Sequence, residues 1–224
     1  MKKLSVLAIA LSAFLISCNK SGDQANTATE QQVAAQTGET FNVDTASSSV
    51  KWIGTHKGGL NPRFGTVDAS GTVSVENGAV TGGEFNIDMA SLTTDKTAVD
   101  PSISDGKTST DLDTHLKSAD FFDIAKYPTS SFKITGVTAF DATKGESVIE
   151  GATNTISGNL TIKDKTVNVT FPAKVTITEN GVSIESKFAI NREDWGLTYG
   201  TDGDAKDWMI SQELNIELNI QAKK

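Results

Sequence analysis

Apolar and polar residues alternate with a period of two along most of the chain after residue 40. The alternation is clearest near the C-terminus, where Leu214, Ile216, Leu218 and Ile220 are separated by polar side chains. Successive side chains of a β-strand point to opposite faces, so this pattern predicts strands with one buried and one solvated face. Similar runs predict strands near 48–56, 65–77, 80–93, 130–140, 146–163, 166–178, 182–191 and 209–222.

Short turn sequences join several of these runs. Asn77-Gly78 and Asn180-Gly181 are typical of hairpins, and Lys163-Asp164-Lys165 joins another pair. Strands joined in this way are antiparallel, and eight long antiparallel strands favour closure. We therefore predict an all-β fold, an eight-stranded extended antiparallel β-barrel of the lipocalin-like kind. The lumen of such a barrel holds either packed side chains or one small ligand.

One segment departs from the strand pattern inside this region. Leu116, Ala119 and Phe122 recur at helical spacing, which predicts one short helix near 111–125 that caps a barrel mouth. The preceding residues 94–110 are rich in Thr, Asp, Ser and Gly, and predict a long loop.

The N-terminus has the pattern of an export signal. Lys2 and Lys3 precede an apolar run over residues 4–16, which is shorter than the ~20 residues that a transmembrane helix needs. We predict a signal peptide over residues 1–17. Cys18, the only cysteine, follows Leu-Ile-Ser in an order that resembles the lipobox of bacterial lipoproteins, which predicts lipidation of Cys18 and a membrane anchor.

The residues after Cys18 contain few apolar side chains. Residues 18–39 are predicted to be a disordered tether with a reach of roughly 25 Å, and residues 40–224 one domain. The location predicted for the whole chain is therefore the cell envelope, facing the periplasm or on the outer-membrane surface.

Composition excludes several functions. The formal net charge of −8 argues against nucleic-acid binding. A single cysteine and two histidines provide no disulfide framework or thiolate zinc site, and no catalytic fingerprint is present. The acidic run at 202–207 is a poor calcium loop because Lys206 occupies a ligand position. We expect no catalytic residues, no metal and no enzymatic activity.

Four segments carry a family resemblance. They are Ser49-Val50-Lys51-Trp52 followed by His56; the run His115-Leu116-Lys117-Ser118-Ala119-Asp120-Phe121-Phe122-Asp123 with Lys126-Tyr127-Pro128; Gly158-Asn159-Leu160-Thr161-Ile162-Lys163; and Asn191-Arg192-Glu193-Asp194-Trp195-Gly196. In order and spacing they resemble the YceI-like family of periplasmic and extracellular proteins. The resemblance extends over essentially all of residues 40–224.

This resemblance implies a lipocalin-like barrel that holds a polyisoprenoid chain in a hydrophobic lumen. The expected partners are a long-chain isoprenoid lipid and, through the acyl anchor, a membrane; a homodimer is possible, and no cofactor other than the bound lipid is expected. The chain departs from the family at Thr110-Asp111, where an Arg-Asp pair is common, and at the glycine-rich residues 57–60. Both departures lie near a predicted barrel mouth and affect the expected head-group preference.

Ligand-binding candidates follow from the matched motifs. His115 can meet a lipid head group or fix the helix to the barrel wall, and both readings stay open. His56 fits a solvated loop better, and Arg192 fits a salt bridge with Asp194 or another carboxylate better than head-group binding. The aromatic candidates for the lumen are Trp52, Phe121, Phe122, Phe132, Phe171, Phe188, Trp195 and Trp208.

Two other functions remain compatible with the sequence. A stress-related or structural envelope protein with a filled core would act through partners on the barrel exterior, and it predicts no lumen. An enzyme acting on a lipid or a sugar is the weaker alternative.

Overall fold

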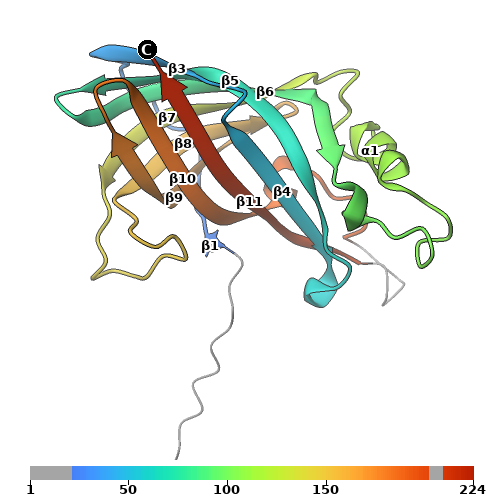
Figure 1. Cartoon of the computed structure of the whole chain (residues 1–224). Helices are drawn as coiled ribbons and strands as arrows, with labels where there is room; N and C mark the ends of the chain where they lie inside the picture. Colours follow the sequence, from blue (N-terminus) through green and yellow to red (C-terminus); the bar gives the residue numbers. More distant parts are fainter. Residues whose placement is uncertain (1–21, 202–208) are drawn as a thin grey trace, which may run out of the picture.

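The computed structural model describes residues 22–201 and 209–224 and shows a closed barrel of eight antiparallel strands with one α-helix (Figure 1). Consecutive strands pair along the chain, and the first also pairs with the last, which closes the barrel. The barrel strands are β4 (Ser49–His56), β5 (Arg63–Glu76), β6 (Ala79–Thr94), β7 (Thr129–Ala139), β8 (Asn154–Ile162), β9 (Lys165–Ile177), β10 (Gly181–Asn191) and β11 (Ile210–Lys223). The predicted eight-stranded barrel is confirmed.

The period-two pattern accounts for the inside of the barrel. In β9, Val169, Phe171 and Ala173 are fully buried, whereas the residues between them face outward. Equivalent inward positions on the other strands form one contiguous apolar core. Gly158 in β8 lets the ring of Phe132 lie directly against the wall, since a Cβ there would stand 2.2 Å from the ring.

Two predicted elements have different boundaries. The strand predicted over 146–163 begins only at Asn154. The helix predicted near 111–125 is α1 (Ser109–Lys117), which begins at a capping box between Thr108 and Asp111. It ends where the backbone and hydroxyl of Ser118 both donate to the His115 carbonyl, which terminates the helical hydrogen bonding.

One end of the barrel carries the helix and all three short 3₁₀ segments. These are η1 (Lys57–Gly59) after β4, η2 (Lys96–Ala98) after β6 and η3 (Arg192–Trp195) after β10. We call this end the mouth. The opposite end carries the tight β5–β6 and β9–β10 turns and the C-terminus (Figure 1).

An N-terminal strap, residues 22–37, completes the wall between β9 and β10. These two strands pair only from Val182 and Ile177 to Glu185 and Lys174, after which they separate. β1 (Asp23–Gln24) pairs in parallel with β10, and β2 (Asn26–Ala28) pairs antiparallel with β9. The strap therefore supplies the hydrogen bonds that β9 and β10 do not make to each other.

The strap then crosses the outer face of β8, β7 and β6. The Asn159 side chain accepts from the Gln31 backbone amide at 3.0 Å and donates to the Gln31 carbonyl at 2.7 Å. Asn168 donates to the Asn159 side chain at 2.9 Å, and the Ala34 amide donates to the Ile134 carbonyl. Asn159 and Asn168 point away from the lumen, and their burial follows from the strap that covers them.

After the strap the chain enters β3 (Glu39–Val43), which lies between β11 and β5 beyond the N-terminal end of β4. The prediction of a disordered tether over residues 18–39 is therefore wrong for residues 23–37. The segment is ordered by backbone and amide hydrogen bonds, which need no apolar side chains of its own, and by the buried Ala25.

Several predictions fall on residues outside the described ranges. These are the signal peptide, Cys18, Trp208 and the acidic run at 202–207. Within the described ranges, no helix has the length and apolarity needed to cross a bilayer.

Replacing Asn159 tests the strap. Asn159→Ala removes both bonds to Gln31 and the one to Asn168, so we expect a loss of about 2–3 kcal/mol in the free energy of unfolding, measured by urea denaturation. Amide hydrogen exchange at Gln31 and Ala34 should accelerate. Asn42→Ala, at an exposed strand position, is the control and should change little; equal effects of the two variants would contradict the role of the strap.

Candidate functional site: an apolar cavity at the barrel mouth

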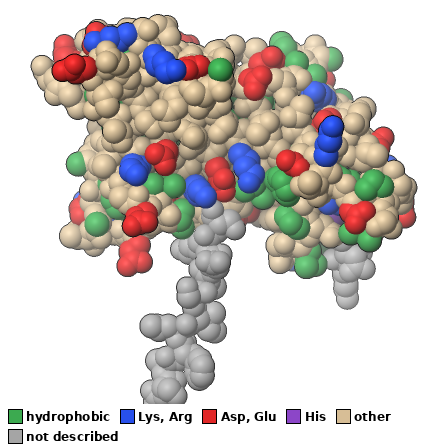
Figure 2. Space-filling model, in the orientation of Figure 1, with side chains coloured by type: hydrophobic (Ala, Val, Ile, Leu, Met, Phe, Trp, Pro, Cys, Tyr) green, Lys and Arg blue, Asp and Glu red, His purple; other side chains and the backbone are tan. Residues whose placement is uncertain are grey.

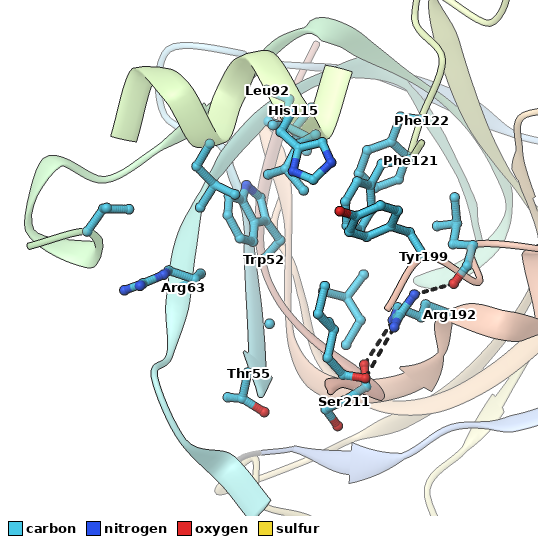
Figure 3. Close-up of a pocket in the computed structure, with 18 of the residues that line it drawn as sticks. Trp52, Thr55, Arg63, Leu92, His115, Phe121, Phe122, Arg192, Tyr199 and Ser211 are labelled. Atoms are coloured by element: carbon cyan, nitrogen blue, oxygen red, sulfur yellow. Dashed lines mark hydrogen bonds between the residues drawn. The ribbon is translucent and has the colours of Figure 1, made fainter. Parts of the chain in front are cut away.

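The main cavity of the described structure opens at the mouth and has a volume of about 890 Å³. Strands β4, β5, β6, β8 and β11 contribute most of its apolar wall, and α1 with the following turn covers one side (Figure 3). The apolar wall residues are Val50, Trp52, Val67, Ile87, Met89, Leu92, Val99, Ile103, Leu112, Leu116, Phe121, Phe122, Leu160, Ile162, Leu197, Ile210, Leu214 and Ile216. The volume is typical of a pocket for a single organic ligand.

A second, inner cavity of about 100 Å³ lies deeper in the barrel. It shares Val50, Ile87, Leu160 and Ile216 with the main cavity, so the two are neighbours along one lumen. Its wall is entirely apolar and includes four phenylalanines, of which Phe171 and Phe188 stack with centroids 4.0 Å apart. These rings narrow the lumen below the main cavity.

Three aromatic rings meet beneath α1 at the edge of the main cavity (Figure 3). His115 makes edge contacts with Phe121 and Tyr199, at centroid distances of 5.1 and 4.8 Å, and Phe121 lies 5.0 Å from Tyr199. His115 Nε2 lies 3.2 Å from an Asp120 carboxylate oxygen. This contact joins the helix to the turn that follows it and not to the barrel wall.

Arg192 lies in the cavity wall and binds backbone carbonyl groups. Its guanidinium donates to the carbonyls of Leu197, Ile210 and Ser211 (Figure 3). Burial of the side chain lowers the pKa of Arg192 from its ordinary value. The salt bridge with Asp194 or another carboxylate expected from the sequence is replaced by these bonds, which tie the turn after η3 to the start of β11.

Arg63 and His56 lie at the outer edge of the cavity. Arg63 donates to the Ala98 carbonyl and, at 3.4 Å, to the Ser104 hydroxyl, and so holds the 95–108 loop against the barrel. His56 Nδ1 lies 3.1 Å from the Asn61 side-chain amide. Burial lowers the pKa of His56, and the positive charge of Arg63 lowers it further, so the neutral imidazole is favoured.

The structure places most of the predicted ligand-binding residues in one lumen. Six line the main cavity, namely Trp52, His56, His115, Phe121, Phe122 and Arg192. Phe132, Phe171 and Phe188 line the inner cavity instead. Trp195 lines neither cavity; it is buried core, and its Nε1 donates to the Leu160 carbonyl at 2.9 Å.

Sequence reasoning missed several wall residues. Tyr199 and Arg63 belong to loops or strand ends whose pattern gives no sign that they approach the cavity. Leu214 and Ile216 belong to the alternating run of β11, so the sequence predicts that their side chains point inward. The alternation does not indicate whether an inward residue lines a cavity or packs in a filled core.

The described residues contain no group of three or more His, Cys, Asp or Glu side chains placed to hold a metal ion. The buried Trp52 Nε1 has no hydrogen-bond acceptor within the described part of the chain. An unpaired donor in an apolar wall is unfavourable until the oxygen of a water molecule or of a ligand satisfies it.

Comparison with known proteins agrees with this fold. A family model described as the YceI-like domain matches residues 41–222. The structure is similar to that of BcnA from Burkholderia cenocepacia, with 21% identity and a TM-score of 0.57 over 81% of this chain and 99% of that one. It is also similar to a polyisoprenoid binding domain from Saccharophagus degradans implicated in plant cell wall breakdown, with 13% identity and a TM-score of 0.53 over 86% and 99%. No curated protein sequence matched the chain.

Arg192→Met tests the role of the guanidinium. The change leaves three carbonyls without a charged donor, and we expect the free energy of unfolding to fall by about 3 kcal/mol in chemical denaturation. Lys187→Met in β10, which removes an exposed ion pair with Glu217, is the control and should cost under about 1 kcal/mol. Equal losses would show that the carbonyl contacts contribute nothing.

The pKa of His56 can be measured by NMR titration. We expect a value below the ordinary 6.5, because burial and the charge of Arg63 both disfavour the imidazolium. Since the folded pKa is lowered, this histidine should reduce stability as pH falls through 6.5 and below. Arg63→Met should raise the pKa of His56 only partly, because burial is the larger cause; an unchanged pKa would exclude the charge effect.

Proposed function

Because the chain belongs to the YceI-like family, we propose that its barrel binds a long-chain isoprenoid or a similar lipid as a carrier. The observation that carries the proposal is the apolar cavity of about 890 Å³, which opens at one end of the barrel and continues toward a second apolar cavity. The protein from Saccharophagus degradans with the same fold is described as polyisoprenoid binding.

The distribution of polar residues along the lumen predicts the orientation of the bound ligand. The inner cavity has only apolar walls, whereas Arg63, His56 and Asn61 lie at the outer edge of the main cavity. A prenyl chain is therefore expected to lie with its tail toward the phenylalanines and its polar end toward the mouth. An oxygen atom of the ligand within reach of the Trp52 Nε1–H would satisfy this unpaired donor.

The apolar wall provides enough free energy to retain such a lipid. Burial contributes about 0.8 kcal/mol per methylene, so fifteen enclosed methylene equivalents contribute about 12 kcal/mol before the costs of association and chain ordering. Retention without a covalent bond is therefore expected.

A filled-core protein that acts through its exterior would have no lumen. The presence of the main cavity argues against that alternative. Nor does the described cavity bring together a nucleophile, a base and an oxyanion donor, so a carrier fits better than an enzyme.

We also propose that the protein acts at the cell envelope, anchored through acyl groups on Cys18. The support is the order of residues 1–18, with two lysines, an apolar run and a single cysteine. Because the strap begins at residue 22, only residues 19–21 separate the anchor from the folded domain, and the barrel would lie much closer to the membrane than the tether first predicted.

Mass spectrometry of bound lipid is the direct test. Residues 19–224, which contain the whole strap and barrel, are purified from a bacterial host without detergent, and we expect a species with isoprenoid mass in the native spectrum and in the organic extract. A clean ligand-free mass that persists after incubation with prenyl lipids would reject the carrier function.

Blocking the lumen should abolish binding. Ile87 lines both cavities, and Ile87→Trp should reduce uptake of a fluorescent prenyl analogue by more than tenfold while the barrel remains folded by circular dichroism. Asn86→Trp places the same ring on the outer face of the same strand and should leave uptake unchanged. Similar uptake by both variants would place the ligand elsewhere.

A further inference from the structure

We infer that four phenylalanine rings form a floor across the lumen, and that this floor selects the length of the isoprenoid chain that the barrel binds. The rings belong to Phe85, Phe132, Phe171 and Phe188, which we call the aromatic floor. The inner cavity lies against these rings and takes the last isoprene unit of the chain. This inference rests on the proposed function, because it names the length of chain that the same lumen accepts.

The four rings form a continuous row. The ring centroid of Phe132 lies 6.1 Å from that of Phe85 and 5.9 Å from that of Phe171. Phe171 stacks on Phe188 at 4.0 Å, with the two ring planes 4° apart. The rings project from β6, β7, β9 and β10, and β6 and β10 lie on opposite sides of the eight-stranded barrel. The row therefore spans the lumen. All four residues line the inner cavity, and none of them lines the main cavity.

The barrel is filled on the side of the floor that faces away from the mouth. Ile134 in β7, Ala173 in β9 and Ile184 in β10 point inward at positions further from the mouth than the rings, and they are 1%, 0% and 3% exposed. These side chains belong to the contiguous core of the barrel. Because a packed core has almost no voids, a chain that enters at the mouth cannot continue beyond the rings.

The wall and the neighbouring rings hold the aromatic floor in place. The ring of Phe132 lies against Gly158, where any side chain would collide with it. Phe171 is enclosed between Phe132 and Phe188 and is fully buried. A ring that is packed on both sides cannot turn away without opening a void, so the floor is a fixed stop.

The inner cavity is an unfilled apolar space at this stop. Its volume is about 100 Å³, and its wall is entirely apolar. An engineered apolar cavity of about 150 Å³ stays dry and holds a benzene ring, which corresponds to roughly 25 Å³ per carbon. On that scale the inner cavity holds about four carbons, close to one isoprene unit. An empty apolar cavity destabilises a fold, so filling it with the end of the chain is favourable.

The same scale gives the length of the chain. The main cavity of about 890 Å³ holds roughly 35 carbons, and its outer edge, with Arg63 and His56, is the place for the polar end. We therefore expect an optimum at about six to eight isoprene units. A shorter chain leaves the inner cavity empty, and a longer chain leaves part of its apolar length in water.

The exterior of the barrel provides no comparable apolar surface on the face that Figure 2 shows. Acidic, basic and apolar side chains are interspersed there, whereas the two cavities share part of one continuous apolar wall. Differences in affinity between chains of different length are therefore expected to arise in the lumen.

Competition between chain lengths tests the aromatic floor. The full chain, freed of bound lipid, is incubated with detergent micelles that contain equal amounts of polyprenyl alcohols differing by single isoprene units, and the bound species are identified by native mass spectrometry. The parent protein should show maximal binding at one length. Phe188→Ala removes a ring from the floor and should shift this maximum to a chain longer by about one isoprene unit. Phe41→Ala, which removes the same atoms from the core outside both cavities, is the control and should leave the maximum unchanged.

A second variant tests the floor in the opposite direction, and it keeps the test decisive if Phe188→Ala fails to fold. Ala69 lines the inner cavity, so Ala69→Leu should fill that cavity and shift the maximum to a chain shorter by about one isoprene unit. Ala79→Leu adds the same atoms at an exposed position and should cause no shift. The inference is overturned by a parent without a maximum, or by floor variants that change occupancy at every length without moving the maximum. Failure of the parent to bind any of the alcohols would reject the proposed function itself.

Discussion

The unpaired backbone between β9 and β10 determines how this barrel is completed. The two strands separate after Glu185 and Lys174, and a gap in the wall would leave amide and carbonyl groups without partners beside the stacked Phe171 and Phe188. The strap fills the gap from outside the region that the family model matches. The integrity of the lumen therefore depends on polar residues that precede the recognised domain.

The same constraint links the strap to the cavity. An apolar lumen that is not filled by side chains loses the packing that stabilises an ordinary core, so the wall must be held from outside. Asn159 and Asn168 provide such support, because their outward side chains are buried under the strap directly behind the cavity residues Leu160 and Val169. At the mouth, Arg192 has a comparable role through three carbonyl groups.

The sequence predicted the features that depend on local pattern. Alternation in runs such as residues 214–220 specified strands and the direction of their side chains, and the matched motifs brought Trp52, His115 and Phe121 into one expected site. The strap was missed because its hydrogen bonds go to residues distant in the sequence, such as Asn159, which lies 128 positions from Gln31. Its composition therefore resembled that of a disordered segment. The core position of Trp195 and the carbonyl partners of Arg192 likewise depend on the path of a loop, which no periodicity encodes.

Placement of the strap has a consequence for any truncated form of the protein. A chain that began at residue 41, where the family match starts, would present two exposed strand edges on β9 and β10 in place of a sealed wall. Exposed edges recruit other strands, and the most complementary one is the strap of a neighbouring copy. Intact and truncated molecules mixed together would thus exchange this segment in the manner of donor-strand complementation, which would produce chain-swapped dimers and aggregates.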